Sequence, residues 1–236
     1  MKPTELLARA PTGDGDEMTL TRRDGAYYLN LKSSGELMTS RAHGSEKALA
    51  TLAIAAMPKT PRPRVLVGGL GFGYTLRAAL DALPPDAEVV VAELFDLVLT
   101  ANRGEVGELA GRPLDDPRVS VRMGDVRDAL GDATFEAILL DVDNGPEAFT
   151  LAANSRLYSG KGLARLARSL VPRGILGIWS NAEGPPSEPV LRRFETSGFF
   201  TPWVERTRSR ERGRGAHHTI VLARRLPPER AEASAD

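Results

Sequence analysis

The chain has 236 residues, and its 31 Lys and Arg are balanced by 31 Asp and Glu. This length fits one α/β domain with a small additional unit, and zero net charge does not favour a protein that binds polyanions over a wide surface. The absence of cysteine excludes disulfides, iron–sulfur clusters and cysteine nucleophiles. No apolar stretch approaches the roughly 20 residues of a membrane span, and the N-terminus lacks a signal-peptide core. We therefore expect a cytoplasmic protein.

The first 58 residues predict a small N-terminal unit. Residues 1–16 are polar and contain Pro and Gly, which predicts a loose tail. Asp24-Gly25 separates two strand-like runs, and this dipeptide favours the tight turn of a β-hairpin. A helix is expected over residues 45–57, with Ser45 as its N-cap and Pro58 after its end.

From residue 64 onward, short apolar strands alternate with helical segments. The expected strands are residues 64–69, 87–94, 117–125, 135–143 and 174–180, and the expected helices are residues 73–83, 96–110, 126–130, 160–170 and 187–198. Strands over 199–207 and 217–225 follow with no helix between them, which predicts one antiparallel strand. This order predicts an α/β fold with a Rossmann-like, mostly parallel seven-stranded sheet over residues 59–225. Residues 226–236 have the composition of a disordered tail.

A glycine-rich loop follows the first strand of the alternating region. Gly69, Gly71 and Gly73 form a G-x-G-x-G pattern at the carboxyl end of the strand, where α/β sheets bind ligands. Tyr74 stands where a dinucleotide fingerprint needs its third glycine, and no Gly-Lys-Ser/Thr of a P-loop follows. The pattern indicates a nucleotide site, and a tight turn without a ligand is the alternative.

Acidic residues stand at the ends of the next three strands. Glu93 ends the second strand, where a carboxylate can accept hydrogen bonds from ribose hydroxyls. Asp125 ends the third strand, within reach of an adenine amino group. Asp141 and Asp143 end the fourth, and both point the same way if the chain is extended. Each could be an ordinary solvated or turn residue, but together they describe an adenosine pocket with a carboxylate beside it.

Five segments in this order carry a family resemblance, namely VLVGGLGFGYTLRAAL, VVVAELF, DDPRVSVRMGD, AILLDVDNGP and LARSLVPRGILGIWS. The sequence resembles the spermidine synthases and their spermidine synthase-like relatives, within the class I AdoMet-dependent methyltransferase superfamily. The resemblance implies that Gly69, Gly71 and Gly73 wrap an AdoMet-type donor, that Glu93 binds ribose and that Asp125 lies by adenine. It also implies that Asp141 is catalytic. We include Asp143 as a second catalytic candidate because its charge would raise the pKa of Asp141.

The sequence departs from this family where polyamines and the donor amine bind. Gly71 replaces the Asp of the aminopropyltransferase glycine loop, and Asn144 replaces the second Asp of the fourth-strand loop. The family's Tyr-His-Glu stretch retains only Glu46, and Val67 stands where ordinary methyltransferases have an acid. We therefore expect alkyl transfer, with methyl transfer ahead of aminopropyl transfer. The donor would be AdoMet or decarboxylated AdoMet, without a metal, and the acceptor a small amine. A non-catalytic nucleotide-binding protein and an RNA-modifying enzyme are the alternatives.

The remaining candidates concern the acceptor and possible partners. Tyr158, after the fourth-strand loop, and Glu46 are candidate substrate residues. Trp179 is interpreted as core, His217 and His218 as structural, and the arginine-rich segment 205–214 as a solvated loop. We expect no membrane or nucleic-acid partner, and the resemblance implies a possible homodimer.

Overall fold

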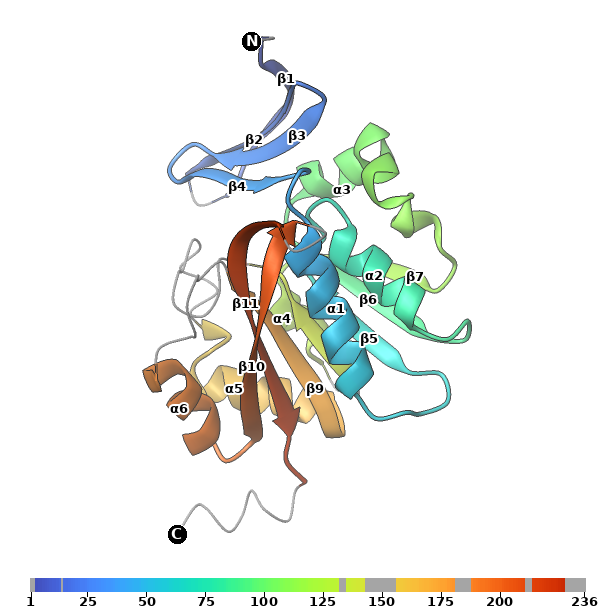
Figure 1. Cartoon of the computed structure of the whole chain (residues 1–236), viewed down its shortest axis with the longest axis vertical. Helices are drawn as coiled ribbons and strands as arrows, with labels where there is room; N and C mark the ends of the chain where they lie inside the picture. Colours follow the sequence, from blue (N-terminus) through green and yellow to red (C-terminus); the bar gives the residue numbers. More distant parts are fainter. Residues whose placement is uncertain are drawn as a thin grey trace.

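The computed structural model describes residues 3–13, 15–131, 135–142, 156–180, 188–210 and 214–227. These residues form a central seven-stranded sheet and a separate four-stranded sheet from the N-terminal part of the chain. Figure 1 shows the four-stranded sheet standing beyond one end of the central sheet.

The central sheet has the order β10-β11-β9-β8-β5-β6-β7. The bounds of its strands are β5 Arg64–Gly68, β6 Glu88–Glu93, β7 Val119–Met123, β8 Phe135–Leu140, β9 Leu170–Ser180, β10 Phe200–Arg210 and β11 Arg214–Arg225. Strands β5 to β9 pair in parallel, while β11 is antiparallel to both β9 and β10. The predicted Rossmann-like sheet with one antiparallel strand is therefore confirmed.

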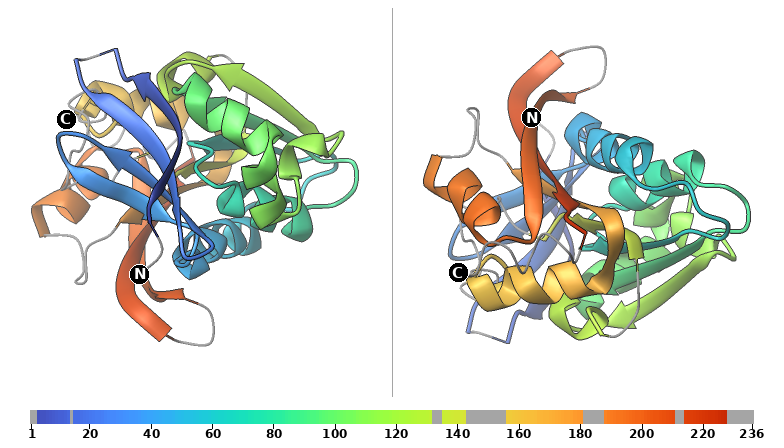
Figure 2. Two further views of the ribbon diagram at one scale, coloured as in Figure 1. Left: turned by 90° about the horizontal axis from the view of Figure 1, so that it is seen from above. Right: turned by 90° about the horizontal axis from the view of Figure 1, so that it is seen from below.

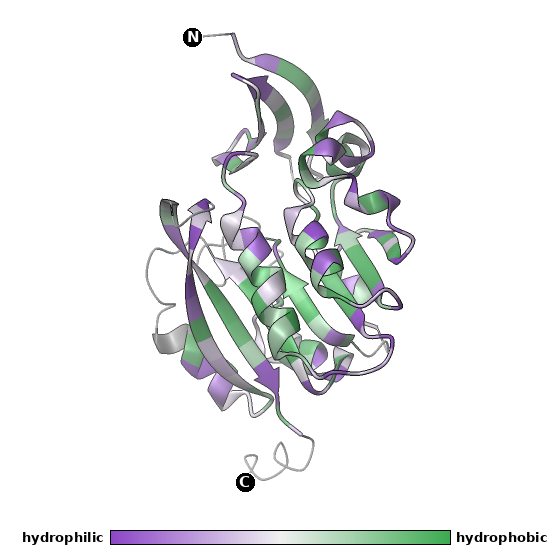
Figure 3. Cartoon of the chain, turned by 45° about the vertical axis from the view of Figure 1, so that its right-hand side comes forward, coloured by the Kyte–Doolittle hydropathy of each residue, from purple (hydrophilic) through white to green (hydrophobic). Residues whose placement is uncertain are grey.

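The central strands are apolar because helices cover both of their faces. On one face, Val65 and Val67 of β5 pack with Leu49 and Leu76 from the helices α1 and α2. On the other face, Leu66 packs with residues of α4, α5 and α6. The helices are α1 Gly44–Ala56, α2 Tyr74–Ala82, α3 Asp96–Arg103, α4 Val126–Ala129, α5 Gly160–Ser169 and α6 Glu188–Thr196. Figure 2 shows α1 and α5 on opposite sides of the sheet, and Figure 3 shows the apolar colour of its central strands.

Two helix predictions need correction. The single helix expected over 96–110 is α3 followed by a 3-10 helix, Glu105–Ala110, because Gly104 leaves the helical region with φ −93° and ψ −144°. A second 3-10 helix, Pro113–Asp115, follows. Ser45 does not cap α1, since the helix begins at Gly44 and its N-cap residue is His43. Ser45 lies inside the first turn with its side chain buried.

The N-terminal sheet is larger than the predicted hairpin unit. Its four antiparallel strands are β1 Glu5–Pro11, β2 Glu17–Arg23, β3 Ala26–Leu31 and β4 Gly35–Thr39, in the order β1-β2-β3-β4. The hairpin at Asp24-Gly25 is confirmed, and both residues have positive φ, 49° and 73°. The prediction of a loose tail over residues 1–16 is wrong, because β1 pairs with β2 along its length.

The chain connects the two sheets through α1, which packs against α2 and β9 rather than against the N-terminal strands. An ion pair of 3.3 Å between Arg22 of β2 and Glu105 ties the N-terminal sheet to the central domain. The proposed division of the chain at residue 58 stays a prediction. Among the described helices, we find none with the length and hydrophobicity of a membrane span.

Candidate active site

A cavity of about 400 Å³ lies between the carboxyl ends of the central strands and the N-terminal sheet. Gly69 and Gly71 from the glycine loop, Glu93 from β6 and Asp125 after β7 line one part of it. The described lining also contains Glu46, Asp141, Trp179, Ser209 and His218, and, from the N-terminal sheet, Met18, Leu29, Leu31, Glu36, Leu37, Met38 and Thr39. The structure thus gathers residues separated by up to 200 positions around one space, at the edge where open α/β sheets bind ligands.

Each glycine of the glycine loop has a positive φ and lies close to a neighbouring group. Gly69 has φ +85°, and a Cβ there would lie 2.3 Å from the carbonyl oxygen of Asp141. Its backbone therefore packs directly against the end of β8. Gly71, with φ +52°, faces Met38 of the N-terminal sheet. Gly73, with φ +81°, is the N-cap of α2 and packs beside Pro113, outside the described lining. Of the three predicted glycines, two reach the cavity.

Glu93 is almost fully buried, with 4 % of its surface exposed, and it holds the glycine loop in place. The Leu70 N–H donates to Oε2 at 2.8 Å and the Phe95 N–H donates to Oε1 at 2.8 Å. Burial raises the pKa of Glu93, whereas these backbone donors act in the opposite direction. The Leu94 and Gly71 N–H groups lower its pKa as well, so a ligand hydroxyl in the cavity would share the Glu93 oxygens with these backbone donors.

Asp125 has a structural role beside the cavity as well. It is the N-cap of α4 and accepts a hydrogen bond from the Arg127 N–H at 2.8 Å. Its carboxylate also forms an ion pair of 2.6 Å with the Arg127 side chain. The hydrogen bonds from Arg127 hold the pKa of Asp125 below its usual range. This carboxylate stays ionised at the cavity wall and can accept a further hydrogen bond.

The partly buried Asp141 and the buried Glu46 form an acid pair. The Thr75 hydroxyl donates to Asp141 Oδ2 at 2.7 Å, and its oxygen also lies 3.4 Å from the carbonyl oxygen of Glu46. Burial raises the pKa of Asp141 to about 6, against the effect of the Thr75 hydrogen bond. Burial, together with the charge of Asp141, raises the pKa of Glu46 to about 8. Near neutral pH the pair therefore keeps a proton, as expected for two neighbouring carboxyl groups that are largely removed from water.

Ser45 connects this pair to the β11 strand. Its hydroxyl donates to Glu46 Oε2 at 3.0 Å and lies 2.8 Å from His218 Nδ1. The Trp179 ring packs edge-on against the His218 ring, with 4.9 Å between their centroids. The interpretations of Trp179 as core and of His218 as a merely structural residue are therefore incomplete, since both line the cavity.

Tyr158 is not brought into this site. Its side chain is 1 % exposed and packs in the core on the α5 side of the sheet, so it is absent from the described lining. Its position after the fourth-strand loop gave no indication of the direction of its side chain. Asp143 and Asn144 lie outside the described residues. Among the described residues, no group of three or more His, Asp or Glu side chains has an arrangement that could hold a metal ion.

The shifted pKa of Glu46 predicts how stability depends on pH. Because its folded pKa lies above the unfolded value of 4.5, its contribution is fully present below about pH 4.5 and is lost as pH rises through about 8. The free energy of unfolding should fall over this window, by at most about 1.4 kcal/mol per pH unit for this group. In Glu46→Gln the fall should be shallower, as measured by urea unfolding from pH 5 to 8. Glu195→Gln, on the exposed side of α6, should keep the wild-type slope, and an unchanged slope in Glu46→Gln would contradict the prediction.

Known proteins match this chain in structure but not in sequence. No protein-family model matches the chain, and no curated protein matches its sequence. Solved structures do match. A spermidine synthase in complex with the transition-state analogue AdoDATO superposes with a TM-score of 0.69 and 18% identity, over 93% of this chain and 72% of that one. The spermidine synthase of Thermotoga maritima gives a TM-score of 0.69 and 17% identity over the same shares.

The chain has a spermidine synthase-like fold. A provisionally named O-methyltransferase from Klebsiella pneumoniae also matches, with a TM-score of 0.53 and 21% identity, over 77% of this chain and 80% of that one. The class I AdoMet-dependent methyltransferase fold predicted from the sequence is thus confirmed. Because the superposition with a spermidine synthase covers 93% of this chain, the similarity of fold extends well beyond the central sheet.

Proposed function

We propose that this protein is an enzyme that transfers an alkyl group from an AdoMet-type sulfonium donor to a small nucleophile, with methyl transfer favoured. The observation that carries the proposal is the position of Glu93. Its buried carboxylate lines the cavity on the β6 side of the Gly69–Gly71 backbone, and Asp141 lines it on the β8 side. A carboxylate that could bind the ribose of a nucleoside and a base of raised pKa thus line the same cavity, in a fold found in AdoMet-type transferases.

The described lining suggests how a donor would be held. Asp125 and the partly buried ring of Phe95 stand on the side expected for adenine, and Glu93 stands on the side expected for ribose. The glycine loop passes between this side and Asp141. We infer that these groups orient the donor so that its reacting carbon faces Asp141.

Met38 supports methyl transfer over aminopropyl transfer. A Cβ at Gly71 would lie 2.8 Å from Met38 Cε, so the thioether side chain occupies the space that a side chain there would need. The family resemblance places at this position an Asp that holds the amine of decarboxylated AdoMet in aminopropyltransferases. Here the corresponding region is apolar, which removes the charge that would select that donor.

For this reaction the protein has to orient the two reactants and to accept a proton from the amine. The electron pair of an amine nitrogen forms the new N–C bond while the C–S bond breaks and its electrons return to sulfur. Orientation of the two reactants is worth roughly 7–11 kcal/mol. Asp141 can accept the proton that the amine must lose before it attacks, because its pKa of about 6 leaves it ionised near neutral pH and more basic than an ordinary Asp.

Thermal unfolding with AdoMet, decarboxylated AdoMet and methylthioadenosine tests the donor site. A ligand at 100 times its Kd adds about 2.7 kcal/mol, which corresponds to a rise in Tm of about 5–10 °C for a chain of this length. We expect AdoMet and methylthioadenosine to raise the Tm, and AdoMet to do so more than its decarboxylated form. A preference for decarboxylated AdoMet would indicate aminopropyl transfer, and no response to any of the three would refute the donor site.

A substitution of Glu93 would also disturb the glycine loop that it supports. The proposed role of Glu93 is therefore tested by changing the ligand. Methylthioadenosine and its 2′,3′-dideoxy analogue differ only in the ribose hydroxyls that Glu93 would bind. We expect the analogue to bind about tenfold more weakly by calorimetry, because it loses two hydrogen bonds that contribute about 0.5–1.5 kcal/mol each. Equal affinities would remove the ribose contact from the proposal.

A further inference from the structure

The N-terminal sheet presents an apolar face to the cavity. Met18 of β2 pairs with Leu31 of β3, and Leu29 of β3 pairs with Met38 of β4. Cross-strand partners lie on the same face of a sheet, and these four side chains all line the cavity together with Leu37. Apart from Thr39 and Glu36, the described part of this sheet therefore gives the cavity a hydrocarbon wall.

The acids on the acceptor side are confined to one place. The Thr75 hydroxyl contacts Asp141 Oδ2 and the backbone carbonyl oxygen of Glu46, and the charge of Asp141 acts on the Glu46 carboxyl group. The Trp179 ring lines the same cavity. Glu36, the acidic residue that the N-terminal sheet adds to the lining, is exposed to water. A ligand that spans this part of the cavity thus meets carboxylates at one end and apolar side chains at the other.

We propose that the acceptor is an amphipathic monoamine, whose single basic nitrogen lies at Glu46 and Asp141 and whose apolar body lies against Met18, Leu29 and Leu31. This inference rests on the transferase function proposed above and narrows its substrate class. It sets the acceptor apart from a diamine, which would have to place a second ammonium group against the hydrocarbon wall.

Charge and solvation both support a single cationic group. Because burial and the charge of Asp141 raise the pKa of Glu46, the acid pair keeps a proton near neutral pH and matches a monocation better than a dication. An ammonium ion that loses water without gaining a carboxylate is strongly disfavoured. The Trp179 ring also lines this cavity, and an aromatic ring attracts a cation that lies over its face.

A matched pair of ligands tests the inference. Pentylamine and 1,5-diaminopentane have the same five-carbon chain. They differ only in that the diamine has a second amino group on the terminal carbon. With the protein saturated by methylthioadenosine, calorimetry should give an affinity for pentylamine at least about tenfold higher than for the diamine. An equal or higher affinity for the diamine would overturn the inference.

The same titration separates this inference from the proposed function. If methylthioadenosine binds and neither amine does, the donor site stands and the monoamine acceptor is refuted. If methylthioadenosine itself does not bind, the transferase function fails, and the inference fails with it.

Substitutions in the N-terminal sheet provide the second test. Met38→Glu places a carboxylate on the hydrocarbon wall, so the affinity for the diamine should rise at least about tenfold relative to pentylamine. Leu6→Glu puts the same charge on β1, where Leu6 is 52% exposed and outside the described lining, and it should leave the ratio unchanged. Should Met38→Glu fail to fold, Glu36→Gln decides the question. A loss of diamine affinity in Glu36→Gln would mean that Glu36 binds a second ammonium group and would overturn the inference.

Discussion

Replacing Asp141 by Asn is expected to lower kcat for amine alkylation by about 10²–10⁴-fold and to leave the affinity for methylthioadenosine unchanged. The amide keeps the shape of the side chain and can still accept the hydrogen bond from Thr75, which is 2.7 Å from Asp141 Oδ2. It cannot take a proton from the acceptor nitrogen. Steady-state rates with AdoMet and an amine, together with calorimetry of methylthioadenosine, measure the two effects separately.

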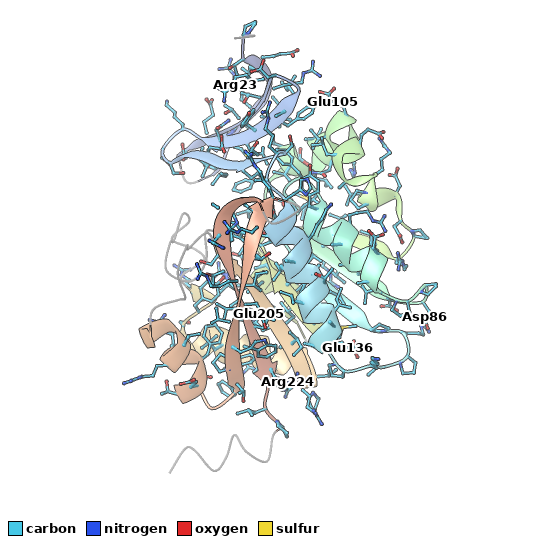
Figure 4. All side chains as sticks on the ribbon, in the orientation of Figure 1. Arg23, Asp86, Glu105, Glu136, Glu205 and Arg224 are labelled. Carbon is cyan, nitrogen blue, oxygen red and sulfur yellow. The ribbon has the colours of Figure 1, made fainter. Side chains whose placement is uncertain are left out.

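The pH profile and a matched control sharpen this test. In the wild type, kcat should rise as pH increases through about 6, where Asp141 loses its proton, and this rise should vanish in the Asn variant. Asp86→Asn makes the same change on an exposed loop residue, far from the N-terminal sheet (Figure 4), and should keep full activity. Unchanged turnover in Asp141→Asn would remove Asp141 from the proton-transfer role.

The central sheet could be predicted because its signal is local. Runs such as Val65–Val67 and Val89–Val91 are apolar at every position since both faces of a parallel strand are buried, and glycines or acids mark the carboxyl ends. The strand-end position of Glu93 and Asp125 followed from the same pattern, and the structure brings both to the cavity. Alternation of strands and helices then leaves few possible topologies.

The N-terminal sheet was only partly predictable, because its stability depends on partners distant in sequence. Residues 5–11 have a polar flanking composition that resembles a tail, yet they pair with β2, and Arg22 of β2 bonds both Glu5 and Glu105. The partly buried Leu7 and Ala10 pack against the main core. None of these contacts is visible in the periodicity of residues 1–16 alone.

The acceptor side of the cavity was the least predictable part. The sequence analysis selected Glu46 through a family resemblance, whereas Trp179 and His218 were interpreted as structural. They meet because β11 pairs with β9, with Ile220 opposite Trp179 in the register, and because α1 brings Ser45 within 2.8 Å of His218. Strand register and helix docking are long-range properties, and a useful signal was the position of both residues at the same end of neighbouring strands.

The second large effect is expected from Gly69→Ala, which should destabilise the fold by about 2–5 kcal/mol and abolish methylthioadenosine binding. The positive φ of +85° costs an L-residue about 1–2 kcal/mol. The added Cβ would lie 2.3 Å from the Asp141 carbonyl oxygen, so β8 and the glycine loop must separate, and overpacking of this kind costs about 1–3 kcal/mol more. Urea unfolding measures the loss of stability, and calorimetry measures the loss of binding.

Gly111→Ala separates backbone strain from the contact with Asp141. Gly111 also has positive φ, +65°, but a Cβ there would meet nothing within 4 Å. It lies after the 3-10 helix Glu105–Ala110 and outside the described cavity lining, so its replacement should cost only the strain of about 1–2 kcal/mol and preserve ligand binding. Equal losses of stability in the two variants would show that the close approach of the glycine loop to Asp141 contributes nothing. The joint loss of stability and binding in Gly69→Ala alone would tie the geometry of the candidate base to that of the donor loop.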